Sequence, residues 1–279
     1  MIICADDFGI AADVDQSILT LASEQKISAV SIMAALLPGT TPALRELLQR
    51  RATLDLGLHL MLTGPGRPSG PERADSLSPA GQFLSPAALL QQCLCRQIGI
   101  RDARDHIAAQ YRRFVELCGF APDFLDGHLH VHQFPGIRDG LLAFMAEFRT
   151  GAQPYIRNTH EPVAAILQRG VAPLKSWGIG VFGRTLARRL IQQGIPTNSG
   201  FGGICDYRRW SEYPRCLSRF IRHARRPNDL IMVHPGLQEA WRKAEYNGLQ
   251  QVVFPPNQPS RFSFAKQADE LQNSRCLAG

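Results

Sequence analysis

The chain has 279 residues, of which 44% are hydrophobic, so it can bury one barrel-sized core or two small ones. No apolar run reaches the length of about 18 residues that a membrane-spanning helix needs, and seven cysteines without a Cys-x-x-Cys spacing predict reduced thiols and a cytoplasmic location. The formal net charge of +7 favours anionic partners such as phosphates and membrane faces, whereas the lack of an aromatic-basic motif gives no support to nucleic-acid binding.

The first half of the chain alternates short apolar runs with amphipathic segments, a pattern typical of parallel strands joined by helices. The expected strands are residues 2–5, 28–37, 55–60 and 124–132, and the expected helices are residues 11–25, 42–51, 86–97, 103–118 and 137–148. Residues 64–81 are rich in Gly, Pro and Ser and predict a long surface loop, of the kind that covers a substrate.

The second half continues the alternation less clearly. The expected strands are residues 155–157, 194–198 and 230–233, and the expected helices are residues 162–168, 182–193 and 213–224. From residue 255 the chain is polar and lacks periodicity, which predicts a poorly ordered tail. We therefore expect one domain over residues 1–254, with about seven parallel strands, followed by a tail over residues 255–279.

Polar side chains stand where the predicted strands end. They are Asp6, Asp7, His59, His128, Arg157 and His234. Polar groups collected at the C-terminal edge of a parallel sheet are the expected layout of an α/β-barrel active site. An open doubly wound sheet is the alternative, but no Gly-x-Gly-x-x-Gly follows the first strand.

The run of residues 126–132 carries four ionisable side chains at alternate positions: Asp126, His128, His130 and His132. In an extended segment all four would point to the same face. Alternate residues then lie about 6.6 Å apart, so one metal ion could take only one or two of them and the others would contact substrate or support the ligands. A solvated histidine-rich loop is the alternative.

Asp6 and Asp7 are adjacent carboxylates that would diverge in an extended segment and so perform different tasks; capping of the next helix is the simpler alternative. Asp7, His59 and His128 supply one carboxylate and two imidazoles from three strand ends, which suits a divalent metal with open positions. Asp6 could then take a proton from water, and His234 could protonate a leaving group. These groups fit the hydrolysis of an amide or ester.

Four motifs together carry a resemblance to a known family. They are Ala-Asp-Asp-Phe-Gly at residues 5–9, Gly-Leu-His-Leu at residues 57–60, Asp-Gly-His-Leu-His-Val-His at residues 126–132 and Val-His-Pro-Gly at residues 233–236. In this order, from residue 2 to about residue 250, the chain resembles the YdjC/ChbG family of carbohydrate deacetylases. It looks most like the branch associated with hopanoid biosynthesis.

The resemblance implies a (β/α) barrel-like fold and metal-dependent removal of N-acetyl groups from amino sugars. It implies that Asp7, His59 and His128 bind one divalent ion, zinc or magnesium, with Asp6 as the base and His234 as the acid. The residues expected to contact substrate are Asp126, His130, His132 and Arg157. A lipid-linked N-acetylglucosamine, such as an N-acetylglucosaminyl hopanoid, is the expected substrate, and a chitooligosaccharide of the diacetylchitobiose type is the alternative.

Residues 242–249 match the family pattern Arg-x-x-Glu-x-x-x-Leu, but residues 252–279 do not supply the helix that usually follows. Two other classes stay open, a metal-dependent phosphoesterase on a similar barrel and a non-catalytic sugar- or metal-binding protein. The expected partners besides the sugar are an anionic membrane face, approached by the basic residues 182–193, and a second copy of the chain in a homodimer.

Overall fold

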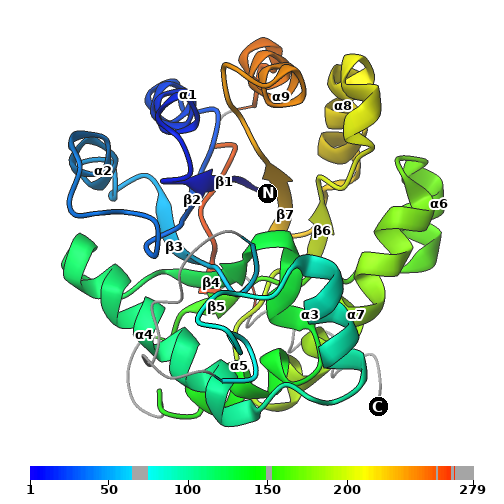
Figure 1. Cartoon of the computed structure of the whole chain (residues 1–279). Helices are drawn as coiled ribbons and strands as arrows, with labels where there is room; N and C mark the ends of the chain where they lie inside the picture. Colours follow the sequence, from blue (N-terminus) through cyan, green and yellow to red (C-terminus); the bar gives the residue numbers. More distant parts are fainter. Residues whose placement is uncertain (65–74, 149–152, 256, 265–266, 268–279) are drawn as a thin grey trace.

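The computed structural model describes residues 1–64, 75–148, 153–255, 257–264 and 267. Within these residues, seven parallel strands form one curled sheet in the order β5-β4-β3-β2-β1-β7-β6 (Figure 1). The strands are β1 (Ile2–Phe8), β2 (Ala29–Ile32), β3 (Asp55–Leu60), β4 (Phe124–Gly127), β5 (Tyr155–Ile156), β6 (Gly200–Gly202) and β7 (Asp229–Val233). The predicted α/β barrel-like fold with seven parallel strands is confirmed.

The helices surround this sheet on its outer side (Figure 1). They are α1 (Ala12–Ser23), α2 (Pro42–Leu48), α3 (Pro86–Leu94), α4 (Ile100–Cys118), α5 (Ile137–Met145), α6 (Val163–Arg169), α7 (Pro173–Gln192), α8 (Tyr213–His223) and α9 (Ala240–Gln251), with 3-10 turns η1 (His128–Gln133) and η2 (Tyr207–Glu212). None of the helices in the described part of the chain is long and apolar enough to cross a membrane.

Strand β1 lies inside the sheet between β2 and β7, and all seven of its residues are buried. Alternate side chains point to opposite faces of a strand. Ile2 and Cys4 join an apolar cluster inside the barrel, whereas Ile3 and Ala5 join the larger core beneath the helices. Burial on both faces is why the strands read as continuous apolar runs in the sequence.

The sheet curls until its two edge strands approach each other. Ile156 of β5 forms an isolated parallel bridge with Thr197, three residues before β6 begins, and the Ile156 N–H donates to the carbonyl of Pro196 at 2.9 Å. The predicted sixth strand at residues 194–198 therefore lies too early, because β6 is Gly200–Gly202 and the earlier residues make only this bridge. An open doubly wound sheet does not bring its edges together in this way.

Two predicted segments are described only in part. Residues 65–74 of the predicted loop lie outside the described residues, as does most of the predicted tail. Of the tail, Phe262 stacks on Tyr155 with ring centroids 4.2 Å apart, and its backbone N–H donates to Asp55 at 2.7 Å. These contacts place part of the segment against the N-terminal end of the barrel, while the division at residue 254 stays a prediction.

Helix α9 carries a buried carboxylate into the end of β7. Glu245 is almost fully buried, and its Oε2 accepts a hydrogen bond from the backbone N–H of His234 at 2.5 Å. Burial raises the pKa of Glu245 from 4.5 to about 8, although the hydrogen bond from His234 and the charge of Arg242 act in the opposite direction. The carboxyl group is therefore protonated in the folded protein at pH values where the unfolded chain has lost that proton.

This raised pKa predicts a pH-dependent stability. Between pH 4.5 and pH 8 the folded state holds a proton that the unfolded state lacks, so the free energy of unfolding should fall by up to about 1.4 kcal/mol per pH unit as the pH rises. Glu245→Gln should remove this component, because glutamine does not titrate. Urea unfolding of both proteins across the same pH range measures the difference, and two parallel stability curves would contradict it.

Candidate active site

A cavity of about 320 Å³ opens at the C-terminal ends of β1, β3, β4 and β7. Side chains predicted from the sequence supply much of its polar lining: Asp6, Asp7, His59, His128, His130 and His234. The remaining polar lining, which the sequence did not indicate as functional, comes from Lys175, Tyr207 and Arg242. The structure thus gathers groups separated by as much as 236 positions into one hollow at the edge of the barrel where such a site was expected.

Asp6 and Asp7 reach this hollow through a break in the regular strand. Asp6 follows Ile2 and Cys4 in pointing inside the barrel, whereas regular alternation would turn Asp7 toward the helices. Asp7 instead has a φ of 71°, in the left-handed region, and the register with β2 shifts between Ala5 and Phe8. Such a conformation is costly for a non-glycine residue and is often found at functional sites. It brings both carboxylates to the same cavity.

Asp7, His59 and His128 converge on one point. Asp7 Oδ1 lies 3.4 Å from His59 Nε2 and 3.2 Å from His128 Nδ1, and the three donor atoms lie within 4.8 Å of one another. One carboxylate and two imidazoles suit zinc and related transition metals better than magnesium, which prefers oxygen ligands. These residues therefore fit a single divalent ion.

A carboxylate behind His59 sets the orientation of its ring. Asp126 Oδ1 lies 2.7 Å from His59 Nδ1 and also accepts a hydrogen bond from the Ser31 hydroxyl at 2.5 Å. Burial alone would lower the pKa of His59, but Asp126 and Asp7 raise it to about 10. A carboxylate on the far nitrogen of a metal-binding histidine is the usual supporting arrangement, because it fixes which nitrogen faces the metal.

Arg157 is a fully buried cation behind the cavity. Its Nη1 and Nη2 donate to the two oxygens of Asp6 at 2.6 and 2.7 Å, and Nη2 also lies 2.5 Å from Asp126 Oδ2 and 2.9 Å from Cys4 Sγ. Asp6, Asp126 and Cys4 form a second donor cluster, but a guanidinium is seated among them. Arg157 and Asp126 do not line the cavity but lie behind it, in contact with Asp6 and His59, and their expected contact with substrate stays a prediction.

The histidine run does not form the extended segment that the sequence predicted. Strand β4 ends at Gly127 and the turn η1 follows, in which Leu129 and His130 have φ of 54° and 60°. The prediction that all four side chains share one face is therefore wrong. His130 lines the cavity, whereas His132 is buried beneath it with Nε2 2.9 Å from the carbonyl of Arg157. Burial lowers the pKa of His132 to about 4.

His234 follows β7 and faces the metal candidates across the cavity. The hydroxyl of Tyr207 lies 3.3 Å from His234 Nδ1, and donation from this hydroxyl leaves the ring hydrogen on Nε2. Burial lowers the pKa of His234 to about 4, although Asp7 and Asp6 counteract it, so the ring is neutral near pH 7. His234 can therefore present a neutral N–H donor to a bound molecule.

Arg242 of α9 completes the site, because its Nη2 donates to Asp7 Oδ2 at 2.6 Å and leaves Oδ1 to the two imidazoles. The Arg-x-x-Glu spacing of Arg242 and Glu245 was a usable signal, since residues three apart share one face of a helix. No sequence pattern marked Lys175 or Tyr207 as functional. Helix α7, which carries Lys175, begins nine residues before the predicted helix, and Tyr207 lies in the turn η2.

The sequence is similar to those of several named deacetylases. A human carbohydrate deacetylase is 28% identical over 255 residues, which cover 85% of this chain and 74% of the human protein. A mouse carbohydrate deacetylase is 34% identical over 140 residues (49% of this chain and 44% of the mouse protein), and a chitooligosaccharide deacetylase of Proteus mirabilis is 32% identical over 137 residues (49% and 51%). The chain thus spans about half the length of the mouse and Proteus proteins in these matches.

A crystal structure of an Enterococcus faecalis protein named for cellobiose-phosphate cleavage superposes with a TM-score of 0.60 over 90% of both chains at 18% identity, a likeness of fold alone. The model of the family described as YdjC-like protein matches residues 1–257, nearly the whole described barrel. This chain therefore belongs to the YdjC-like protein family.

Proposed function

We propose that this protein is a metal-dependent hydrolase that removes the N-acetyl group from an N-acetylated amino sugar. The observation that carries the proposal is the convergence of Asp7, His59 and His128 at a cavity that Asp6 and His234 also line. Relatives named carbohydrate deacetylase and chitooligosaccharide deacetylase support the same chemistry.

Asp7, His59 and His128 would hold one divalent ion, and their two imidazoles favour zinc over magnesium. When bound there, such an ion would polarise the acetyl carbonyl and make a water molecule more acidic. Asp126 would keep His59 Nε2 turned toward the ion. Arg242, by binding Asp7 Oδ2, would keep Asp7 Oδ1 turned toward it.

The other side chains of the cavity would move the protons. In amide hydrolysis, water adds to the acetyl carbon, the carbon–nitrogen bond breaks and the amine nitrogen gains a proton. Asp6 would accept the proton of the water, because Arg157 holds its carboxylate in place through both oxygens. Asp6 would then pass this proton to the departing nitrogen, while the neutral ring of His234, which Tyr207 orients, would donate a hydrogen bond to that nitrogen.

The finer substrate assignment we propose is a lipid-linked N-acetylglucosamine, such as a hopanoid conjugate, with a free chitooligosaccharide as the alternative. A phosphoesterase using two metal ions is less well supported, because the second donor cluster of the described residues surrounds Arg157. A cytoplasmic location and a homodimer stay predictions.

Removing one ligand tests the metal site directly. His59→Ala should lose both the bound metal and the activity, because a carboxylate and one imidazole hold a divalent ion weakly. Metal content measured by mass spectrometry after zinc loading and gel filtration is the primary readout. His223→Ala, which removes an imidazole of α8 outside the cavity, should keep full metal content. Full occupancy in His59→Ala would rule out this ligand set.

Asp6 and Asp7 should behave differently in the same assays, because Asp6 is the proposed base and Asp7 a proposed metal ligand. Asp6→Asn should keep the metal yet lose about 10²–10⁴-fold in kcat, the usual contribution of a general base. His234→Ala should also keep the metal and lower kcat with little change in KM, because a donor to the leaving group acts mainly in the transition state. Loss of metal from Asp6→Asn would mean that Asp6 is a ligand, and normal turnover of folded His234→Ala would leave that histidine a structural role.

The substrate assignment predicts a preference in kcat/KM. A lipid-linked N-acetylglucosaminide presented in mixed micelles should be deacetylated with a higher kcat/KM than diacetylchitobiose, because groups bound outside the reacting centre contribute to transition-state binding. Acetate release measures both rates. A clear preference for the disaccharide would assign the chain to chitooligosaccharide substrates.

A further inference from the structure

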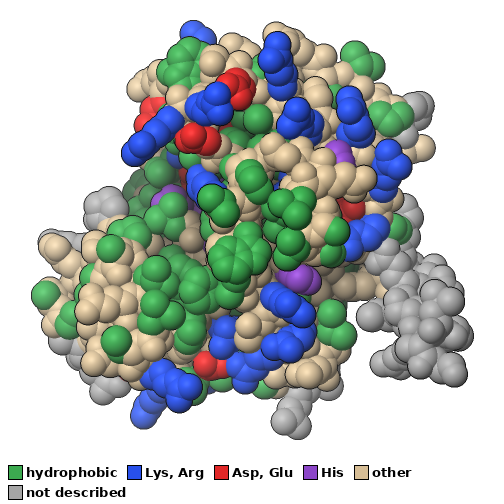
Figure 2. All heavy atoms as spheres, turned by 90° about the vertical axis from the view of Figure 1, so that its right-hand side faces the viewer, with side chains coloured by type: hydrophobic (Ala, Val, Ile, Leu, Met, Phe, Trp, Pro, Cys, Tyr) green, Lys and Arg blue, Asp and Glu red, His purple; other side chains and the backbone are tan. Residues whose placement is uncertain are grey.

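One outer face of the molecule combines exposed apolar side chains with many cations. Figure 2 shows this face, with hydrophobic side chains gathered across it and Lys and Arg side chains above and below them. It includes helices α6, α7 and α8, which lie side by side on the right of Figure 1. Large apolar residues on a protein surface mark interaction sites when they form a contiguous patch.

The apolar residues come from one side of each of two consecutive helices. They are Val163 and Leu167 of α6 and Leu174, Trp177 and Val181 of α7, all exposed. Leu174 is 84% exposed and Trp177 is 55% exposed, so these side chains project outward instead of filling gaps in the core. Their spacings of three and four residues put them in a row along each helix.

The charge of the chain is concentrated in the same region. Residues 162–227 hold 12 of the 31 Lys and Arg residues but only two of the 24 Asp and Glu residues, Asp206 and Glu212, a net charge of +10. The rest of the chain has 19 Lys and Arg against 22 Asp and Glu. The net positive charge of the chain is therefore concentrated in residues 162–227, the segment that contains α6, α7 and α8, although Glu161 and Asp229, just outside it, pair with Arg169 and Arg226.

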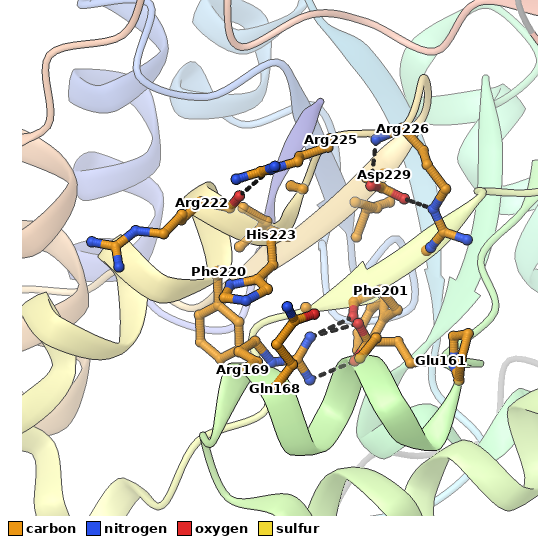
Figure 3. Close-up of a pocket in the computed structure, with 17 residues that line it drawn as sticks. Glu161, Gln168, Arg169, Phe201, Phe220, Arg222, His223, Arg225, Arg226 and Asp229 are labelled. Carbon is orange, nitrogen blue, oxygen red and sulfur yellow. Dashed lines mark hydrogen bonds and ion pairs between the residues drawn. The ribbon is translucent and has the colours of Figure 1, made fainter.

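Four of these arginines line a cavity of about 570 Å³ between α6 and α8: Arg169, Arg222, Arg225 and Arg226. Figure 3 shows Arg169 paired with Glu161 and Arg226 paired with Asp229. Arg222 and Arg225 are exposed, and no carboxylate of the described residues pairs with either. These two cations are thus available to an anion that approaches from outside.

The same helix serves this face and the active site. Lys175 and Ile179 of α7 line the active-site cavity, whereas Leu174, Trp177 and Val181 of α7 are exposed. A surface that contacts the exposed residues would therefore lie beside the active-site cavity.

We propose that this face docks on the surface of an anionic lipid bilayer. We call it the docking face and define it by Val163, Leu167, Leu174, Trp177 and Val181 together with Arg222 and Arg225. The apolar side chains would enter the boundary between headgroups and acyl chains, and the arginines would bind lipid phosphates. Tryptophan and arginine beside aliphatic residues are the composition that favours a membrane interface.

Charge complementarity favours an anionic bilayer, and not a second copy of the chain, as the partner of the docking face. Two copies of a positively charged face would repel each other. The proposal rests on the proposed function only in one respect: docking would bring the cavity to a lipid-linked sugar. Binding to the bilayer needs no turnover, so the two can fail separately.

The test is sedimentation with vesicles of phosphatidylcholine, with and without phosphatidylglycerol. Arg222→Gln/Arg225→Gln should weaken binding to the anionic vesicles about 30-fold, since each basic residue near an anionic surface contributes about 1 kcal/mol. Leu174→Ser/Trp177→Ser should weaken it about 10-fold or more by removing the inserted side chains. Bromine-labelled lipids should quench tryptophan fluorescence of the wild type more than that of the second variant.

Matched controls carry the same changes elsewhere on the surface. Arg96→Gln/Arg101→Gln alters two exposed arginines outside the docking face, Arg101 being 82% exposed, and Val253→Ser alters a residue that is 92% exposed. Both controls should bind vesicles like the wild type. All variants should keep the melting temperature and the turnover of a soluble N-acetylated sugar.

Several outcomes would overturn the proposal: a wild type that does not sediment with anionic vesicles, or that binds neutral vesicles equally well, or docking-face variants that bind like the controls. Vesicle binding without any deacetylase activity would instead reject the proposed function and leave the docking face intact.

Discussion

The site depends on one buried cation. The guanidinium of Arg157 lies inside the barrel and contacts Asp6 from β1 and Asp126 from β4 at 2.5–2.7 Å. Removing one member of such a group leaves an uncompensated buried charge and typically costs about 3–5 kcal/mol. Asp6 is the proposed base, and Asp126 orients the proposed metal ligand His59. The ion pairs of Arg157 with these two carboxylates therefore help to position both the base and the metal ligand.

A second constraint is the left-handed backbone at Asp7. A regular strand would have turned this carboxylate toward the helices, away from the cavity. The turn is sustained by contacts on every side of the side chain: Arg242 on Oδ2, and His59 and His128 on Oδ1. Backbone strain of this kind persists only where the surroundings determine it, which is the situation of a residue surrounded by a buried arginine and two imidazoles.

Charged side chains of different kinds occupy different regions of the molecule. Carboxylates and histidines gather at the C-terminal edge of the sheet, whereas arginines gather on α8 and its neighbours outside the barrel. Helix α7 connects the two regions, because it contributes Lys175 to the cavity and Trp177 to the docking face. One helix thus contributes residues both to the cavity and to the proposed docking face.

The sequence by itself determined most of the strands and the residues at their ends, although it placed β6 too early and extended β4 into the turn η1. Strand β3 was predicted with its observed bounds, because apolar alternation is a local property, and His59 and Asp7 meet because parallel strands end at a common edge. Only the tertiary structure decided the turn η1, the contacts of Arg157 with Asp6 and Asp126, and the contact of Arg242 with Asp7. The physical reason is distance along the chain: Arg157 lies 151 residues from Asp6 and Arg242 lies 235 from Asp7, so no local pattern of hydrophobicity or turn residues records these pairings.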